Sequence, residues 1–156
     1  MAHMSEEGWE QKYVKEAFDT NWVVPMGPNV NTFEQNLSDF ANANIDGSKL
    51  DCKVVCLSAG MAAVHLALIG CGVKGGDEVL VQSFTFCASS HPITYLGAKP
   101  VFVGSEGETW NMDPALLEKA IIDRKTKTGK YPKAIVPVAL YGMPYRIDEI
   151  MLIADK

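Results

Sequence analysis

Two consecutive stretches decide the fold of this chain: Val54-Val-Cys-Leu-Ser-Ala-Gly-Met-Ala-Ala-Val-His-Leu-Ala-Leu68 and Gly75-Gly-Asp-Glu-Val-Leu-Val-Gln82. The first begins as a short apolar run typical of a strand and, after Gly60, continues as an apolar helix. The second is a glycine turn followed by another short apolar strand. A parallel return needs a crossover of a dozen or more residues, so the order strand, helix, strand predicts parallel pairing.

The same alternation continues to the end of the chain. It predicts strands at residues 53–57, 78–82, 100–103 and 134–138, and helices at residues 61–71, 87–96, 113–123 and 147–154. Pro92 should kink or delay its helix, and Asp113 should cap the next one. Right-handed crossovers between these strands predict an α/β fold, with a mainly parallel sheet and flanking helices.

A different pattern precedes the first strand. Apolar residues recur at helical spacing over residues 6–18, and the prolines after them stop that helix. Asn31 or Thr32 can cap a second helix that runs to about residue 43, and residues 44–50 are expected to form a loop. The chain therefore divides into an N-terminal helical segment, residues 1–50, and an α/β part, residues 51–156.

Composition narrows the classes of partner. The 156 residues can bury a sizeable core, and 47% hydrophobic content argues against disorder. The net charge is −5 and the pI about 5.1. The densest basic cluster, residues 124–127, falls between a helical and a strand pattern and is expected to be a solvated loop. Without a broad basic surface, nucleic acid is not an expected partner.

The four cysteines have neither the spacing of a zinc site nor partner histidines. Cys52 and Cys56 can share one face of a strand, where buried cysteine behaves as a small hydrophobe, so no metal site is expected. No export segment is visible, and no apolar run is long enough to span a membrane. We expect a soluble, cytoplasmic protein without a membrane partner.

The turn after the first strand has the geometry of a phosphate site. Gly60 permits a tight turn, and the helix that opens near Met61 points unpaired N–H groups outward at its positive end. The alternative is that Gly60 only allows close packing of strand against helix. The glycine-rich fingerprints of dinucleotide and nucleoside-triphosphate sites are absent.

A second candidate lies after the next strand, in Ser83-Phe-Thr-Phe86. Open α/β sheets bind ligands at the carboxyl ends of their strands, and an aromatic face there suits a flat ring. The alternative is that Phe84 and Phe86 are alternating core residues. His65 and His91 lie in helical patterns and are expected to be packing residues rather than ligands or bases.

Several of these segments together resemble one known family. They are Leu57 to Leu68, Gly76-Asp-Glu-Val79, Ser83 to Phe86, Leu96-Gly-Ala-Lys-Pro-Val-Phe102 and Val138-Ala-Leu-Tyr-Gly142. Their order resembles the DegT/DnrJ/StrS family of pyridoxal-phosphate-dependent sugar aminotransferases. The resemblance implies the N-terminal part of the large domain of a fold type I transferase, similar to aspartate aminotransferase, with an incomplete sheet.

The resemblance also implies roles for particular residues. Gly60 and Met61 match the Gly-Thr pair that contacts the phosphate of pyridoxal 5'-phosphate, with Met in place of Thr. Phe86 matches the aromatic residue that stacks on the pyridine ring. Ala139 replaces a His of the family. The acidic partner of the pyridine nitrogen and the lysine that bonds to the cofactor would lie beyond Lys156, so we assign no catalytic residue here.

The expected activity of the parent enzyme is transfer of an amino group from a donor such as glutamate to a nucleotide-linked keto-sugar, in amino-sugar biosynthesis. The family suggests a homodimer. We expect the 156 residues alone not to catalyse this reaction. Three alternatives remain: a sugar dehydratase of the same family, a non-catalytic remnant or binding module, and an unrelated nucleotide-binding α/β domain.

Overall fold

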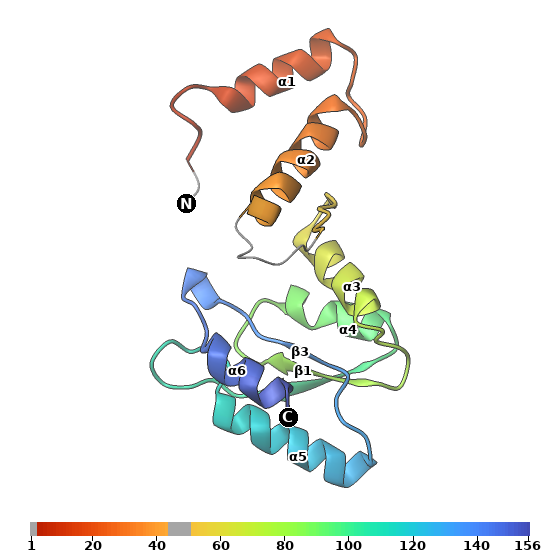
Figure 1. Cartoon of the computed structure of the whole chain (residues 1–156), viewed down its shortest axis with the longest axis vertical. Coiled ribbons are helices and arrows are strands. Elements are labelled where there is room, and N and C mark those ends of the chain that lie inside the picture. Colours follow the sequence, from red (N-terminus) through yellow and green to blue (C-terminus); the bar gives the residue numbers. More distant parts are fainter. Residues whose placement is uncertain (1–2, 44–50) are drawn as a thin grey trace. The chain divides into compact units, whose positions relative to one another are not determined.

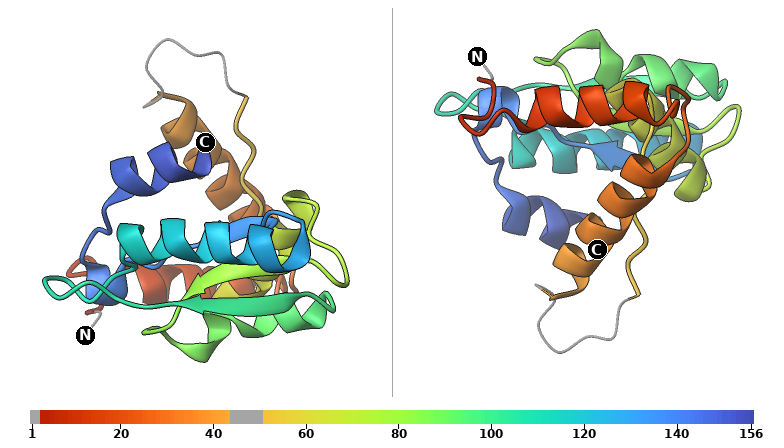
Figure 2. Two further views of the ribbon diagram at one scale, coloured as in Figure 1. Left: turned by 90° about the horizontal axis from the view of Figure 1, so that it is seen from below. Right: turned by 90° about the horizontal axis from the view of Figure 1, so that it is seen from above.

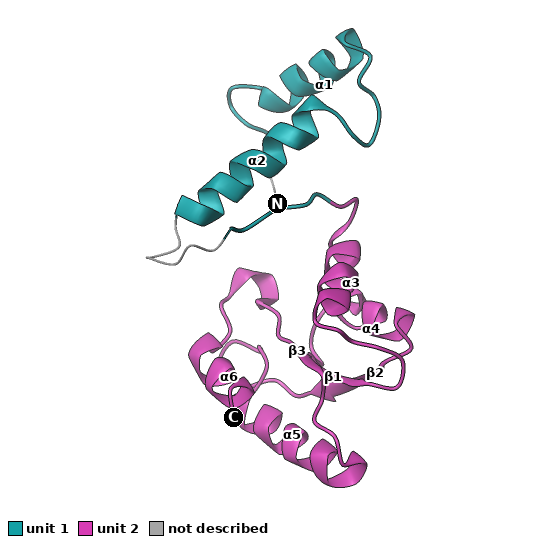
Figure 3. Cartoon of the chain, turned by 45° about the vertical axis from the view of Figure 1, so that its right-hand side comes forward, with its two compact units in different colours: residues 1–56 teal, residues 57–156 magenta. Residues whose placement is uncertain are grey.

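The computed structural model describes residues 3–43 and 51–156 (Figure 1). The chain divides into two compact units, Met1–Cys56 and Leu57–Lys156, coloured separately in Figure 3. The loop expected at residues 44–50 lies outside the described residues. Over the described ranges, no helix is both long and apolar enough to cross a membrane.

The first unit contains two helices, α1 (Trp9–Asp19) and α2 (Pro28–Ala43). Both were predicted, but α2 begins earlier than the expected cap at Asn31 or Thr32. Proline suits the first position of a helix, because its fixed φ is already helical and its missing N–H would have no partner there. The Asn31 amide accordingly donates to the Gly27 carbonyl at 3.1 Å, which closes the first turn.

The strand expected at residues 53–57 does not form. The alternation is present, because Cys52, Val54 and Cys56 are half-buried and the residues between them are exposed. The backbone amides of this segment donate hydrogen bonds to side chains of α2 rather than to a neighbouring strand. The amides of these three residues donate to Asn42 Oδ1 at 2.9 Å, Ser38 Oγ at 3.0 Å and Glu34 Oε1 at 2.7 Å, respectively. All four cysteines of the chain are free.

The second unit is built on a parallel sheet in the order β2-β1-β3. Its strands are β1 (Glu78–Gln82), β2 (Lys99–Val103) and β3 (Ala134–Val136). Leu80 pairs with Val101 on one side and Ile135 on the other. The predicted parallel pairing is confirmed. The last strand ends before residue 138 because Pro137 has no N–H and the Val138 amide donates to a side chain instead.

Helices cover both faces of this sheet (Figures 1 and 2). The helices of this unit are α3 (Gly60–Gly70), η1 (Cys87–Ser89), α4 (His91–Tyr95), α5 (Pro114–Thr128), η2 (Leu140–Gly142) and α6 (Ile147–Ala154). Of these, α3 and α4 cover one face of the sheet, and α5 and α6 cover the other. Leu68 of α3 and Ile93 of α4 pack on Val79 and Val81. On the opposite face, Leu117 of α5 and Ile150 of α6 pack around Leu80. Alternate β1 side chains thus contribute to two cores, as is typical of a strand covered on both faces.

Two helices of this unit differ from the prediction in instructive ways. The segment expected as one helix over residues 87–96 is split into η1 and α4, as Pro92 in the first turn of α4 suggests. The helix expected to end at residue 123 continues to Thr128 and ends at Gly129, which has φ 75°. Asp113 caps it as predicted, accepting from the Ala115 and Leu116 amides.

The basic cluster expected to be a loop therefore lies inside α5. Arg124 is held by a two-pronged ion pair, Nε to Glu78 Oε2 at 2.7 Å and Nη2 to Glu78 Oε1 at 2.8 Å. Lys127 pairs with Asp123 at 2.8 Å, one turn away. The negative end of a helix stabilises basic side chains in its last turn. A basic cluster is therefore as compatible with the end of a helix as with a loop, which is why the loop prediction was wrong.

The amino ends of β1 and β2 are joined by glycine turns. Gly97 has φ 69°, and a Cβ built on it would lie 3.4 Å from the Gly75 Cα. The Gly76 amide donates to the Gly97 carbonyl at 3.0 Å. A side chain at Gly97 would meet both a left-handed backbone and a neighbouring turn, so this end of the sheet depends on glycine.

Candidate cofactor site

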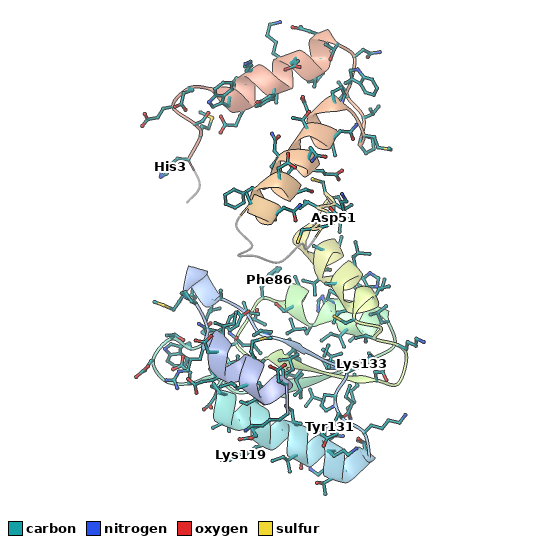
Figure 4. All side chains as sticks on the ribbon, viewed as in Figure 1. His3, Asp51, Phe86, Lys119, Tyr131 and Lys133 are labelled. Atoms are coloured by element: carbon teal, nitrogen blue, oxygen red, sulfur yellow. The ribbon has the colours of Figure 1, made fainter. Side chains whose placement is uncertain are left out.

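A hollow of about 480 Å³ lies at the carboxyl ends of β1 and β3. Its first wall follows β1 and its second wall follows β3; together they comprise Phe84, Thr85, Phe86, Val138, Ala139, Leu140 and Tyr141. Because the strands are parallel, Lys133, just before β3, belongs to the other end of the sheet; Figure 4 labels it and Phe86. The carboxyl end is where open α/β sheets bind their ligands.

Phe86 presents its ring to solvent, with 76% of the residue exposed. Phe84 is also exposed and meets the Trp110 ring edge to face, with 5.7 Å between ring centroids. The alternative that both phenylalanines belong to the core is therefore wrong. Thr85 Oγ1 and Ser89 Oγ lie 3.0 Å apart and fasten this turn to η1. The first wall offers an aromatic face that no core packing requires.

The start of α3 is open. Its N-cap residue, Ala59, has no polar side chain, and its carbonyl accepts from the Ala62 and Ala63 amides. Within the described parts of the chain, the Gly60 and Met61 amides donate no hydrogen bond. A Cβ built on Gly60 would have no neighbour within 4 Å, so close packing does not explain this glycine. Two amides at a positive helix end remain available to an anion.

The Met61 side chain is engaged elsewhere. Its sulfur accepts a hydrogen bond from the Tyr95 hydroxyl of α4 at 3.2 Å. The Tyr95 ring in turn meets His65 at 5.7 Å and an interplanar angle of 74°. His65 is therefore a half-buried packing residue, as expected. Besides α4, α3 also packs against η1, the turn that directly follows Phe86, so neighbouring elements carry the two candidate segments.

The second wall of the hollow is held by two buried side-chain amides that the sequence analysis missed. Gln82, with 0% exposure, ends β1 and accepts from the Val138 amide at 3.2 Å. Asn111, 1% exposed, accepts from the Leu140 amide and donates to the Met143 carbonyl, both at 2.9 Å. Their burial could not be predicted from the sequence, because Gln82 is a polar residue at the end of an apolar strand and Asn111 lies in a polar stretch.

Next to Asn111 lies a carboxylate whose ionised form is stabilised. Glu106 accepts from the Thr109 hydroxyl and from the Glu108 and Thr109 amides. These hydrogen bonds, the Thr109 hydroxyl first, and the nearby charge of Arg146 lower the pKa of Glu106 from 4.5 to about 2. The carboxylate closes the loop between β2 and α5, where Trp110 adopts φ 64°.

The hollow itself carries no acid, base or metal ligand. Its lining is apolar apart from Thr85 and the Tyr141 hydroxyl. Across the described residues, no three histidine, cysteine or acidic side chains gather as a metal site would need. Of the residues singled out in the sequence, Phe86 lines the hollow, whereas Gly60 and Met61 do not. The lining can pack against a flat ring and offers no group for proton transfer or covalent chemistry apart from its two hydroxyls.

The second unit therefore combines a parallel α/β sheet with an exposed aromatic residue at the carboxyl end of β1 and two helix-start amides without partners among the described residues. The family model that describes the DegT/DnrJ/EryC1/StrS aminotransferase family matches residues 4–156. The chain belongs to this family, whose members are pyridoxal-phosphate-dependent aminotransferases. The resemblance seen in the sequence, the fold class and the expected cofactor are confirmed.

Individual relatives agree. The chain is 44% identical over 153 residues to EpsN of Bacillus subtilis, described provisionally as a pyridoxal phosphate-dependent aminotransferase; the match covers 98% of the chain. It is 36% identical over 150 residues, 96% of the chain, to the GDP-perosamine synthase of Caulobacter vibrioides. A solved structure of Streptococcus pneumoniae Spr1654, described provisionally as a sugar aminotransferase and in its PMP form, matches with a TM-score of 0.71 and 33% identity.

The chain spans only about a third of the length of each of these relatives. The share is 37% of EpsN, 36% of the GDP-perosamine synthase and 32% of the Spr1654 chain, although the last match includes 90% of the present chain. The comparisons therefore establish the family of the chain.

Proposed function

We propose that this chain carries the phosphate-binding and ring-stacking parts of the pyridoxal phosphate site of a nucleotide-sugar aminotransferase. The observation that carries the proposal is the open start of α3, where the amides of Gly60 and Met61 lack partners within the described residues. Residues 1–50 would then be the N-terminal helical segment, and residues 51–156 the first part of the large domain.

Each residue has a physical task in this proposal. The Gly60 and Met61 amides donate to the cofactor phosphate, whose charge the positive end of α3 favours. The exposed Phe86 ring stacks on the pyridine ring and fixes its orientation. Bound pyridoxal phosphate supplies the electron-withdrawing ring that amino-group transfer requires. The described side chains around the hollow only bind and orient.

The substrate follows from the relatives rather than from the hollow. The name of one relative, GDP-perosamine synthase, refers to a nucleotide-linked amino sugar. We therefore propose a nucleotide-linked keto-sugar as amino acceptor, an amino donor such as glutamate, and a cytoplasmic homodimer. Because neither lysine nor carboxylate lines the hollow, we also propose that these 156 residues do not catalyse transamination without further groups.

Cofactor binding tests the proposal directly. Pyridoxal 5'-phosphate is titrated into the 156-residue chain and followed by its absorbance and by quenching of tryptophan fluorescence. Replacing Phe86 by alanine should weaken binding about tenfold, because an aromatic contact contributes about 0.5–1.5 kcal/mol beyond its buried area. Phe102→Ala is the matched control, since Phe102 is an exposed phenylalanine on β2, outside the hollow.

The outcomes are distinct. Saturable binding that depends on Phe86 and not on Phe102 supports the site. Absence of saturable binding to the parent chain, or equal losses in the two variants, contradicts it.

A further inference from the structure

The second wall of the hollow contains a backbone conformation that its residue type does not favour. Tyr141 has φ 52° and ψ 26°, in the left-handed region, inside the turn η2. A bulky side chain rarely adopts this conformation, and such residues persist only where their surroundings hold them. Tyr141 is also 95% exposed, so its own ring contributes almost nothing to the packing of the chain.

What holds the turn is the side-chain amide of Asn111. Its Oδ1 accepts from the Leu140 amide before the strained residue, and its Nδ2 donates to the Met143 carbonyl after it, both at 2.9 Å. Both ends of the turn are thus bound to one buried side chain. Asn111 itself is fixed by its backbone carbonyl, which accepts from the Glu106 amide at 2.9 Å.

The Gln82 side chain likewise holds the first wall in place by a hydrogen bond, and it connects the first wall to the second. Its Nε2 donates to the Phe84 carbonyl at 2.9 Å, in the turn that bears Phe86. Its Oε1 accepts from the Val138 amide, where the second wall begins, and from the Met112 amide at 3.0 Å. Since Met112 follows Asn111 in the chain, the side-chain amides of Gln82 and Asn111 form one continuous hydrogen-bond network behind the hollow. We call this network the bracket.

We propose that Gln82 and Asn111 are positioning residues that set the two walls of the hollow, with Asn111 holding the Tyr141 ring where an arriving planar ligand ring meets it. A strained aromatic residue that packs on nothing in its own chain is explained when its ring is presented to a ligand. The identity of that ligand as pyridoxal phosphate rests on the function proposed above, whereas the bracket rests on the contacts alone.

The first experiment measures the bracket without any ligand, by amide hydrogen exchange in the 156-residue chain. Asn111→Asp keeps the acceptor for Leu140 and replaces the donor to Met143 by an oxygen. Exchange at the Gly142 and Met143 amides should accelerate about tenfold or more, as expected for loss of one buried hydrogen bond. Exchange at the β1 amides reports whether the sheet stays folded.

Repeating the Asn111→Asp measurement in a Tyr141→Gly variant separates a positioning role of Asn111 from a merely structural one. Tyr141→Gly removes the strain, because glycine adopts the left-handed region freely. In that background, Asn111→Asp should accelerate exchange at Met143 by less than about threefold, since an unstrained turn needs the clamp less. If Asn111→Asp accelerates exchange at the Met143 amide equally in the parent chain and in the Tyr141→Gly background, the inference is overturned.

The chain offers a matched control in its first unit. Asn42 also uses both ends of its side-chain amide on backbone groups, donating to the Cys52 carbonyl at 3.2 Å and accepting from the Cys52 amide at 2.9 Å. Asn42→Asp should leave exchange at Met143 unchanged. If Asn42→Asp accelerates it as strongly as Asn111→Asp does, the effect is global and the inference fails.

Ligand binding completes the test, with pyridoxal 5'-phosphate as the probe. Asn111→Asp should weaken binding about tenfold, and Asn42→Asp should not. Binding that depends on Phe86 but ignores Asn111 overturns the inference and leaves the proposed function intact. If the parent chain does not bind, the proposed function fails, and the exchange measurements still decide the bracket.

Should Asn111→Asp unfold the sheet, the single variant Tyr141→Gly decides: slower exchange at Met143 supports a strained, clamped turn, and faster exchange overturns it.

Discussion

The sulfur of Met61 accepts the Tyr95 hydroxyl at 3.2 Å, so its side chain is directed along α3 toward α4. The proposed phosphate site relies on two backbone amides and has no hydroxyl donor at position 61. A hydrogen bond to a charged group is worth about 1.5–3 kcal/mol, so a hydroxyl donor at this position would add to the affinity for phosphate.

Met61→Thr should therefore strengthen pyridoxal phosphate binding about tenfold or more. The measurement is the same absorbance titration on the 156-residue chain. Met61→Val is the control, since valine has the shape of threonine without the hydroxyl and also frees Tyr95. Equal affinities of the Thr and Val variants would show that the hydroxyl does not reach the phosphate.

Single residues were only partly predictable from the sequence. Phe86 and Gly60 could be proposed from the sequence because an aromatic residue after a strand and a glycine before a helix lie where open α/β sheets bind ligands, and their roles stay predictions. Gln82, Asn111 and Tyr141 could not, because their parts depend on hydrogen bonds between segments far apart in the sequence. The Gln82 to Val138 contact, for example, closes only when β1 and β3 pair.

At the scale of elements, the loop between β2 and α5 depends on the charge of one side chain. The pKa of Glu106 is lowered to about 2, because three groups donate to its carboxylate and Arg146 lies nearby. A carboxyl whose pKa is lower in the folded state stabilises the fold above its unfolded pKa of about 4.5. That stabilisation is lost as pH falls from about 4.5 toward 2.

Glu106→Gln should accordingly lower the urea midpoint at pH 7 and narrow the difference between the midpoints at pH 7 and pH 3. Urea unfolding followed by circular dichroism measures both midpoints. Glu108→Gln is the control in the same loop, because the Glu108 side chain is exposed and, among the described residues, its carboxylate pairs with Arg146 alone, at 3.3 Å. A pH dependence that survives in Glu106→Gln would show that other carboxyls cause it.

Elements were predictable where local signals and long-range contacts agreed. Asp113 followed by Pro114 began α5 as expected, since a capping carboxylate and an N-terminal proline both act locally. The prediction of a strand at residues 53–57 was wrong, although half-buried and exposed side chains do alternate along this segment. Periodicity reports which side of a segment is buried, and only the three-dimensional structure shows whether a strand or, as here, helix side chains bind its backbone.

At the scale of the whole molecule, charge and exposed apolar surface act against each other. The chain has a net charge of −5 at pH 7 and a pI near 5.1. Large apolar side chains such as Phe18, Met26 and Phe40 are exposed in the first unit, and Phe86 and Tyr141 in the second. Repulsion between like-charged molecules keeps such surfaces apart, and it vanishes where the net charge is zero.

Light scattering of the 156-residue chain should therefore reach its maximum near pH 5 and fall steeply toward pH 8. The measurement is a pH series at constant protein concentration and ionic strength. Added salt at pH 8 should raise the scattering, because it screens the repulsion. Scattering that is flat between pH 5 and pH 8 would show that net charge does not govern association.

The two ends of the sheet differ in how freely they can change over evolution. At the amino end, Gly97 lies against Gly75 in a left-handed backbone, so most substitutions there distort the fold itself. At the carboxyl end, Phe86 and Tyr141 are exposed on a bracket of buried amides. Side chains on that rim can be exchanged while the bracket and both cores stay intact. The fold thus constrains the amino end of the sheet strictly and leaves the exposed side chains at its carboxyl end free to vary.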